Sequence, residues 1–96
     1  MKSINEIISV LKEYLEVNRK KYNLKSLGIF GSYTRGDQTP DSDVDIVVEF
    51  EQPIGLKFVT LANELEVVLQ MKVDLVSRRG VKPKYWAYIK EEVIYV

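Results

Sequence analysis

The sequence contains neither cysteine nor histidine among its 96 residues. Without cysteine, disulfide bonds and thiolate metal sites are excluded, and a reducing cytoplasm is the simplest location. Without histidine, the commonest general base and most zinc sites are excluded as well. Any catalysis by this chain is therefore expected to depend on carboxylates, hydroxyls, lysine, arginine and hard cations such as magnesium.

Long hydrophobic runs are also absent. No apolar run approaches the roughly 18 residues needed to span a bilayer, and Asn5 and Glu6 come too early for a signal peptide. We therefore expect no membrane contact. The hydrophobic fraction of 46% and the charged fraction of 29% are typical of a soluble globular protein. We expect a single domain over residues 1–96, because two domains would each be near the lower size limit for an independent core.

The chain has no excess charge of either sign, since its formal net charge is zero. No direct nucleic-acid binding is expected on that basis. The charges are nevertheless segregated: residues 36–56 hold six acids and no base, and residues 72–90 hold six bases with Asp74 as the one acid. This pattern fits either an acidic pocket beside a basic lip, suited to a metal–polyphosphate ligand, or two ordinary solvated faces.

Hydrophobic periodicity predicts an α/β (α+β) chain with a small mixed sheet flanked by helices. Ser3 and Glu6 form a capping-box signature for a first helix over residues 3–21. The remaining expected elements are a strand over 27–30, a short helix over 32–35, a strand over 44–50, a helix around 58–69, a strand over 73–77, a helix over 83–90 and an apolar end at 93–96.

Three aspartates are candidate metal ligands. Asp43 and Asp45 are two residues apart, so in a strand they project to one side, about 7 Å from each other. Carboxylates at that spacing can share metal ions roughly 3.5–4 Å apart. If the strand carrying Asp74 is a neighbour, all three carboxylates meet, and their repulsion implies a divalent cation. An isolated Asp-x-Asp at the start of a strand, however, usually belongs to a turn, where aspartate side chains hydrogen-bond to the nearby backbone.

Gly31 and Ser32 form a second candidate site. A glycine directly after a buried strand lets the backbone approach a ligand closely. If Ser32 opens a short helix, free N–H groups and the Ser32 hydroxyl can bind phosphate oxygens, although the same pattern occurs at ordinary strand–helix corners. Arg35 can either add charge to such phosphates or pair with Asp37 or Asp41. A left-handed residue at Gly36 is expected to end the helix.

Aromatic residues gather near the last helix. Tyr85, Trp86 and Tyr88 can stack a base or contact a partner, but packing in the core and at interfaces is the expectation we favour. The apolar end, residues 93–96, can form a sheet edge or a docking strip. A homodimer or a hetero-oligomer is therefore compatible with the sequence.

These motifs together resemble those of a known superfamily. Gly31-Ser32, ten intervening residues, Asp43-x-Asp45 and a later strand aspartate at Asp74 resemble the DNA polymerase β-like nucleotidyltransferases. The stretches Gly-Ile-Phe-Gly-Ser-Tyr-Thr-Arg-Gly-Asp and Asp-Ser-Asp-Val-Asp-Ile-Val-Val are similar to those of the minimal nucleotidyltransferase (MntA-like) family. The resemblance covers nearly the whole chain, including the ending Lys-Glu-Glu-Val-Ile-Tyr-Val, and every motif position matches.

The resemblance implies a polymerase β-like fold and a specific activity. Family members act as antitoxins by transferring AMP from ATP to a tyrosine of a partner HEPN-domain RNase. It implies that Gly31 and Ser32 hold the triphosphate, and Arg35 beside them is the candidate to add charge to the phosphates. It further implies that Asp43 and Asp45 ligate magnesium and that Asp74 is the third metal-binding carboxylate. Two Mg²⁺ ions are expected. Asp74 is also expected to help deprotonate the attacking hydroxyl.

Two other functions remain open at this point. The chain can be a binding module that neutralises its partner by steric contact without transfer. It can also be a subunit that transfers nucleotides to a small molecule, although larger relatives do so with extra domains. The sequence leaves open the preferred nucleotide, the number transferred, the acceptor hydroxyl and the oligomeric state.

Overall fold

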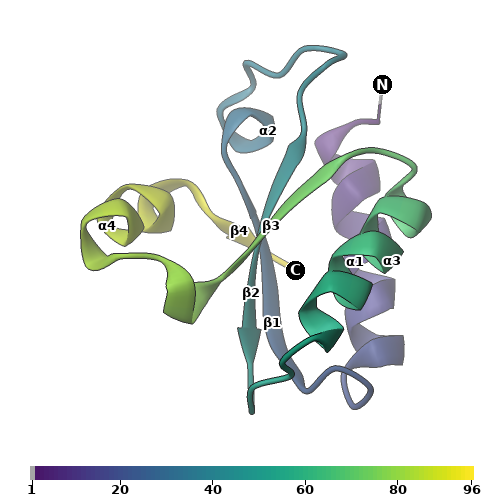
Figure 1. Ribbon diagram of the computed structural model, residues 1–96. Helices are drawn as coiled ribbons and strands as arrows, with labels where there is room; N and C mark the ends of the chain where they lie inside the picture. Colours follow the sequence, from purple (N-terminus) through teal and green to yellow (C-terminus); the bar gives the residue numbers. More distant parts are fainter. Residues whose placement is uncertain (1) are drawn as a thin grey trace.

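In the computed structural model, which describes residues 2–96, a four-stranded sheet carries helices on both sides (Figure 1). The elements are α1 (Ile4–Asn18), β1 (Leu24–Phe30), α2 (Ser32–Arg35), β2 (Val44–Phe50), α3 (Lys57–Leu69), β3 (Val73–Ser77), the 3₁₀ turn η1 (Arg78–Gly80), α4 (Pro83–Glu92) and β4 (Ile94–Tyr95). None of the helices in this part of the chain has the length and apolar character needed to cross a membrane.

The sheet is mixed, as the sequence predicts, with the strand order β3-β2-β1-β4. β1 pairs antiparallel with β2 on one side and with β4 on the other. β2 pairs in parallel with β3, and α3 provides the crossover between them. A parallel pair needs such a crossover, whereas the antiparallel pairs do not.

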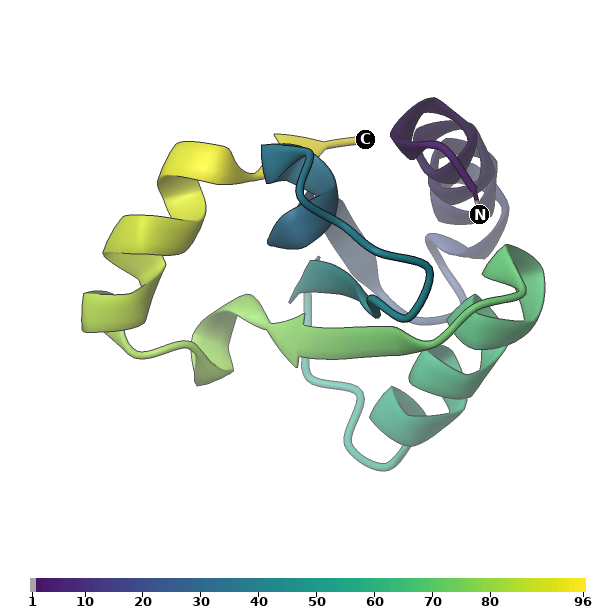
Figure 2. The same ribbon diagram turned by 90° about the horizontal axis from the view of Figure 1, so that it is seen from above.

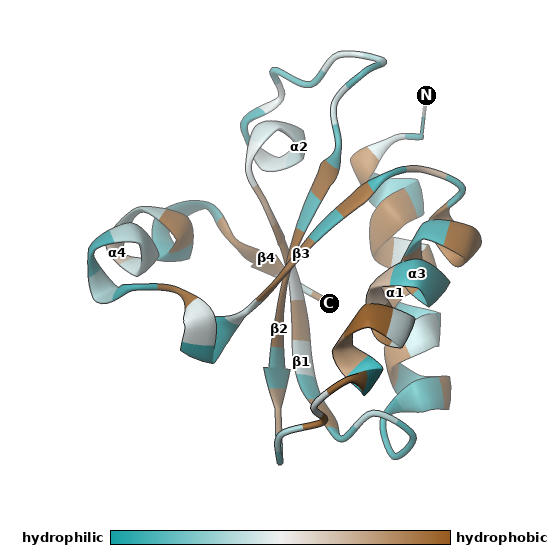
Figure 3. Ribbon diagram, viewed as in Figure 1, coloured by the Kyte–Doolittle hydropathy of each residue, from teal (hydrophilic) through white to brown (hydrophobic). Residues whose placement is uncertain are grey.

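The hydrophobic core lies between one face of the sheet and the helices α1 and α3 (Figure 3). Alternate residues of β2 point into it, namely Val44, Ile46 and Val48, all with 0% exposure. Because side chains alternate across a strand, Asp45 and Val47 lie on the other face. Burial of the apolar row fixes the register, since a one-residue shift would send these side chains to the wrong face.

The connection from α1 to β1 departs from the sequence prediction. The capping box is confirmed, with reciprocal backbone–side-chain hydrogen bonds of 3.1 and 3.2 Å between Ser3 and Glu6. The helix ends at Asn18, however, and β1 already begins at Leu24. Asn23 adopts a left-handed φ of 52°, which reverses the chain, and the N–H of Leu24 donates to the carbonyl of Arg19 at 2.8 Å. Asparagine tolerates this conformation better than most residues.

α4 lies on the side of the sheet opposite to α1 and α3 (Figures 1 and 2). It begins at Pro83 in its first turn, as predicted, and continues to Glu92. No side chain of α4 is buried. Tyr85 and Tyr88 are 58% and 74% exposed, so the expectation that they pack in the core is wrong. The predicted sheet edge at the C-terminal end is confirmed as β4.

A carboxylate joins the two helices that cover the core. Glu64 of α3 accepts hydrogen bonds from the hydroxyls of Tyr14, at 2.9 Å, and Tyr22, and from the ammonium of Lys21 at 3.1 Å. These donors stabilise the charged carboxylate, with the bond from Tyr22 first, and so lower the pKa of Glu64 below its ordinary value of 4.5. Burial and the neighbouring carboxylate raise the pKa of Tyr14 and Tyr22.

Replacing Glu64 by glutamine should destabilise the fold. The amide loses the charge that three donors share, which should cost about 1 kcal/mol of unfolding free energy near neutral pH. Because the folded-state pKa of Glu64 is lowered, its contribution is present above pH 4.5 and is lost as the pH falls through the folded-state value. Urea unfolding of Glu64→Gln at neutral and acidic pH measures the difference. Glu13→Gln on the exposed side of α1 is the control, and equal effects of the two substitutions would contradict the assignment.

Candidate active site

The strand register brings two of the three predicted carboxylates together. Asp45 of β2 is the register partner of Asp74 of β3, and Val47 is the partner of Val76, so both aspartates lie on the face away from the core. Asp45 is also the register partner of Phe30, the last residue of β1. Asp43 precedes β2 by one residue and is exposed. The predicted shared face is therefore found for Asp45 and Asp74.

Asp45 is the carboxyl group whose protonation the fold changes most clearly. Burial raises its pKa from the ordinary 3.8 to about 6, and the charge of Asp74, a hydrogen bond with Asp74 and the charge of Asp43 add to the effect. The guanidinium of Arg35 acts weakly in the opposite direction. Because the two carboxyl groups lie close together in a partly dehydrated site, Asp45 ionises at a higher pH than an isolated aspartate does.

The chemistry of these groups fits a hard divalent cation. Within residues 2–96, no group of three potential metal ligands stands at metal-binding spacing, and the strand register pairs Asp45 with Asp74. Asp45 and Asp74 nevertheless supply paired carboxylate oxygens, the ligands that magnesium prefers. A cation there would replace the proton that the raised pKa of Asp45 now favours. The pair is therefore suited to such an ion.

Gly31 lies directly against the Asp45 carboxylate. A Cβ built on Gly31 would stand 2.1 Å from Oδ2 and 3.1 Å from Cγ of Asp45. Its backbone, with φ 81° and ψ −148°, is a conformation essentially restricted to glycine. Both the space and the conformation therefore require glycine at the corner between β1 and α2. The sequence pattern predicts a close approach of this backbone to a ligand, and the neighbour found in the structure is the Asp45 carboxylate.

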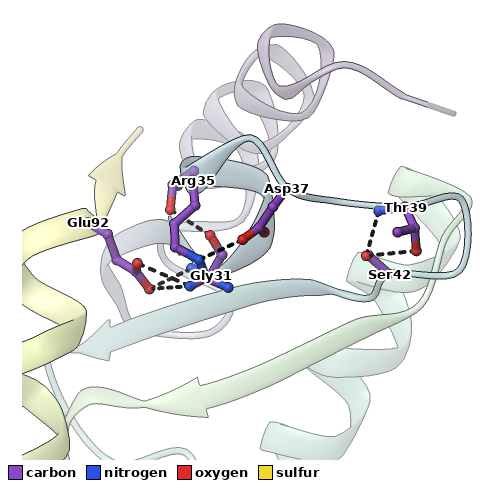
Figure 4. Close-up of polar contacts among 7 residues, drawn as sticks. Gly31, Arg35, Asp37, Thr39, Ser42 and Glu92 are labelled. Atoms are coloured by element: carbon purple, nitrogen blue, oxygen red, sulfur yellow. Dashed lines mark hydrogen bonds and ion pairs between the residues drawn. The ribbon is translucent and has the colours of Figure 1, made fainter.

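The short helix α2 follows this corner. Gly31 is its N-cap without a side-chain hydrogen bond, and the first N–H groups of a helix have no partner inside it. Ser32, the first residue, is partly buried. Gly36 ends α2 in the left-handed conformation, with φ 81° and ψ 13°, as predicted. Beyond it, the N–H of Thr39 donates to the Ser42 hydroxyl at 2.9 Å and closes the turn before β2 (Figure 4).

Arg35 is held by two carboxylates (Figure 4). Its Nε donates to Asp37 at 3.2 Å, and Nη1 donates to both oxygens of Glu92 at 3.2 and 3.3 Å. The predicted pairing with Asp37 is found, whereas Asp41 is not a partner. Glu92 also accepts from the N–H of Gly31 at 3.0 Å. No sequence pattern predicts Glu92, because its partners lie 57 and 61 residues away along the chain.

The bases of the predicted basic lip lie mainly beyond the end of β3 that is farther from Asp74. Arg78 and Arg79 follow the end of β3, whereas Asp74 lies near its beginning. Of the bases in this stretch, Lys72 lines a hollow of about 800 Å³ together with Asp43 and Tyr33. A second hollow of about 530 Å³, lined in part by Arg78, Arg79 and Phe58, contains none of the predicted site residues. The acidic end of the sheet therefore has few basic neighbours.

Alanine at Gly31 should disturb the site more than alanine at Gly36. Both glycines have φ 81°, but a Cβ on Gly36 would meet nothing within 4 Å. We expect Gly36→Ala to cost about 1–2 kcal/mol of unfolding free energy through its left-handed backbone alone. Gly31→Ala should add displacement of the Asp45 carboxyl. Thermal unfolding and the carboxyl ¹³C NMR signal of Asp45 measure the two effects, and an unmoved Asp45 signal in Gly31→Ala would contradict the contact.

Asp45 should titrate near pH 6 in the metal-free protein and fall toward 3.8 in Asp74→Asn, which removes a charge but leaves the burial. Since the folded-state pKa is raised, protonation of Asp45 favours the folded state. Its stabilising effect is complete below pH 3.8 and is lost as the pH rises through about 6. Carboxyl ¹³C NMR titration of both proteins measures the shift, with Asp41→Asn as the control. An unchanged pKa in Asp74→Asn would show that the pair is not coupled.

The sequence comparisons identify the family. A family model described as "Nucleotidyltransferase domain" matches residues 11–96. A Methanocaldococcus jannaschii protein that bears the name of a candidate protein adenylyltransferase is 46% identical over 98 residues, which cover 100% of both chains. "Protein adenylyltransferase MntA" of Thermococcus cleftensis is 40% identical over 97 residues, covering 100% of this chain and 98% of the relative.

Solved structures with the same fold support this assignment. One described as a candidate minimal nucleotidyltransferase has 31% identity and a TM-score of 0.77, and the match covers 93% of this chain and 92% of that one. Another, described as a toxin–antitoxin with AMP-PNP, has 26% identity and a TM-score of 0.76, with coverage of 91% and 69%. Given the fold, the glycine corner and the paired aspartates, the chain belongs to the nucleotidyltransferase domain family and is an enzyme of the minimal nucleotidyltransferase type.

Proposed function

We propose that this chain transfers AMP from ATP to a tyrosine hydroxyl of a HEPN-domain RNase and so acts as its antitoxin in the cytoplasm. The observation that carries the proposal is the Asp45–Asp74 pair placed against the backbone of Gly31. A relative of nearly equal length is named a protein adenylyltransferase, and a structural relative is a toxin–antitoxin with AMP-PNP. Both findings support a protein acceptor and an adenine nucleotide.

The triphosphate would lie at the corner formed by Gly31 and Ser32. Backbone N–H groups at the start of α2 and the Ser32 hydroxyl are donors of the kind that phosphate oxygens accept. Arg35 stands one helical turn away, but it is already paired with Asp37 and Glu92. Its use for phosphate would therefore require an exchange of partners. Such an exchange between exposed ion pairs costs little, because surface ion pairs contribute little in water.

The carboxylates would hold magnesium and handle the acceptor proton. Asp43, Asp45 and Asp74 would bind two Mg²⁺ ions, which neutralise charge on the phosphates and favour ionisation of the attacking hydroxyl. Asp74 is the carboxylate proposed to accept that proton. The tyrosine oxygen then bonds to the α-phosphorus while the bond to the pyrophosphate oxygen breaks. The reaction needs alignment and charge neutralisation more than a histidine, and this chain has none.

Labelling with ATP that carries ³²P at the α-phosphate tests this function. In the presence of magnesium, the chain should label a HEPN-domain protein from the same genome on tyrosine, and EDTA should abolish the labelling. Asp43→Asn and Asp45→Asn should each reduce the rate at least about 100-fold. Asp41→Asn, a change of an exposed acid in the same loop, should retain the parent rate. If Asp43→Asn labels as fast as the parent, the proposed site is wrong.

Protection of cells separates catalysis from steric neutralisation. Co-expression of the active chain with the HEPN-domain protein should restore growth, and the Asp43→Asn/Asp45→Asn double variant should not. Rescue by the double variant at equal protein levels would instead show that binding alone neutralises the partner.

A further inference from the structure

One side of α4 is covered by nothing in the described part of the chain. α4 has no buried side chain, and the rings of Tyr85 and Tyr88, one helical turn apart, are 58% and 74% exposed. Trp86 is partly buried instead, with the guanidinium of Arg78 at 4.0 Å from its ring. The two tyrosines are thus free to contact another molecule. Exposed tyrosines are frequent anchors of protein interfaces.

The position of α4 relates these tyrosines to the site. α4 stands on the side of the sheet opposite to α1 and α3 (Figure 2), which is the side to which Asp45 and Asp74 point. Its last residue, Glu92, reaches Gly31 and Arg35 (Figure 4). α4 therefore borders the open catalytic face and runs toward the carboxylates. A protein that approaches Asp45 and Asp74 from this face would lie beside α4.

The charge of this region indicates what kind of protein fits. Residues 75–90 contain five bases, Arg78, Arg79, Lys82, Lys84 and Lys90, and no acid. Arg79, Lys82 and Lys84 are exposed. The zero net charge of the whole chain hides this local excess, in which Glu49 and Glu51 are the acids that line the same hollow as Arg78 and Arg79. An acidic protein surface would be attracted here and oriented before contact.

We propose that Arg79, Lys82, Lys84, Tyr85 and Tyr88 form the acceptor-docking surface, and that its occupant is an acidic face of the acceptor protein. This inference rests on the proposed transfer to a protein hydroxyl. The tyrosines supply contact area and the three bases supply orientation. A single-stranded RNA fits less well, because it would run from these bases into Asp43, Asp45 and Asp74. A symmetric second copy would place bases against bases.

Transfer kinetics test the surface with the full chain and a HEPN-domain protein from the same genome. Tyr85→Ala/Tyr88→Ala and, separately, Lys82→Glu/Lys84→Glu should raise the KM for the protein acceptor at least about 10-fold. The KM for ATP should stay unchanged, whereas a loss of folded protein would lower kcat and leave both KM values unchanged. The matched controls are Val17→Ala, at a 75% exposed position, and Lys20→Glu, both near the end of α1 behind the sheet. Both controls should behave as the parent.

The outcomes separate this inference from the proposed function. If the parent chain labels no protein, the proposed function itself fails. If the parent labels the acceptor and both α4 variants keep its KM, the docking surface is wrong. Two further results would also overturn it: competition by an oligo(U) RNA that depends on Lys82 and Lys84, or a monomer–dimer shift of the chain alone caused by the tyrosine variant. A selective rise in acceptor KM supports it.

Discussion

The register of β2 between its two neighbours is the constraint on which the rest of the site depends. It sets Asp45 beside Asp74 on one side and beside the end of β1 on the other, where Gly31 follows. The same register is fixed from the opposite face by Val44, Ile46 and Val48, which are completely buried. A shift of β2 by one residue would expose Val44, Ile46 and Val48 and turn Asp45 inward. The core residues of β2 therefore determine where Asp45 lies, although they point to the opposite face of the sheet.

Much of this arrangement can be predicted from the sequence because it depends on local patterns. Alternation in β2 predicts the face of Asp45, the glycine after a buried strand predicts a close backbone approach, and Ser3 with Glu6 predicts the first helix start. Glu92 and the pairing of β4 cannot be predicted in this way, because both depend on tertiary contacts between the C-terminal segment and β1. The exposed tyrosines of α4 are a similar case. Aromatic residues are common in protein cores, and only the packing of the folded chain shows that nothing in its described part covers Tyr85 and Tyr88.

Electrostatics at the site differ from what the overall composition indicates. A chain of zero net charge places Asp43, Asp45 and Asp74 at one end of the parallel strands β2 and β3 and a basic stretch after the other end of β3. At the acidic end the fold neutralises part of the charge with the proton that Asp45 retains up to about pH 6 and with Arg35 between Asp37 and Glu92. A cation would replace the proton on Asp45, and a polyphosphate would replace the carboxylates of Asp37 and Glu92 on Arg35, so the free protein already carries substitutes for its ligands.

The absence of buried side chains in α4 has a consequence for the motions of the chain. The core formed by the sheet, α1 and α3 needs nothing from this helix, so α4 can open locally at a lower free energy than global unfolding. Such an opening would carry Glu92 away from Gly31 and Arg35. A partly unfolded state is thus one form in which this arginine lacks its C-terminal partner, and a molecule that holds α4 in place changes how often that state is visited.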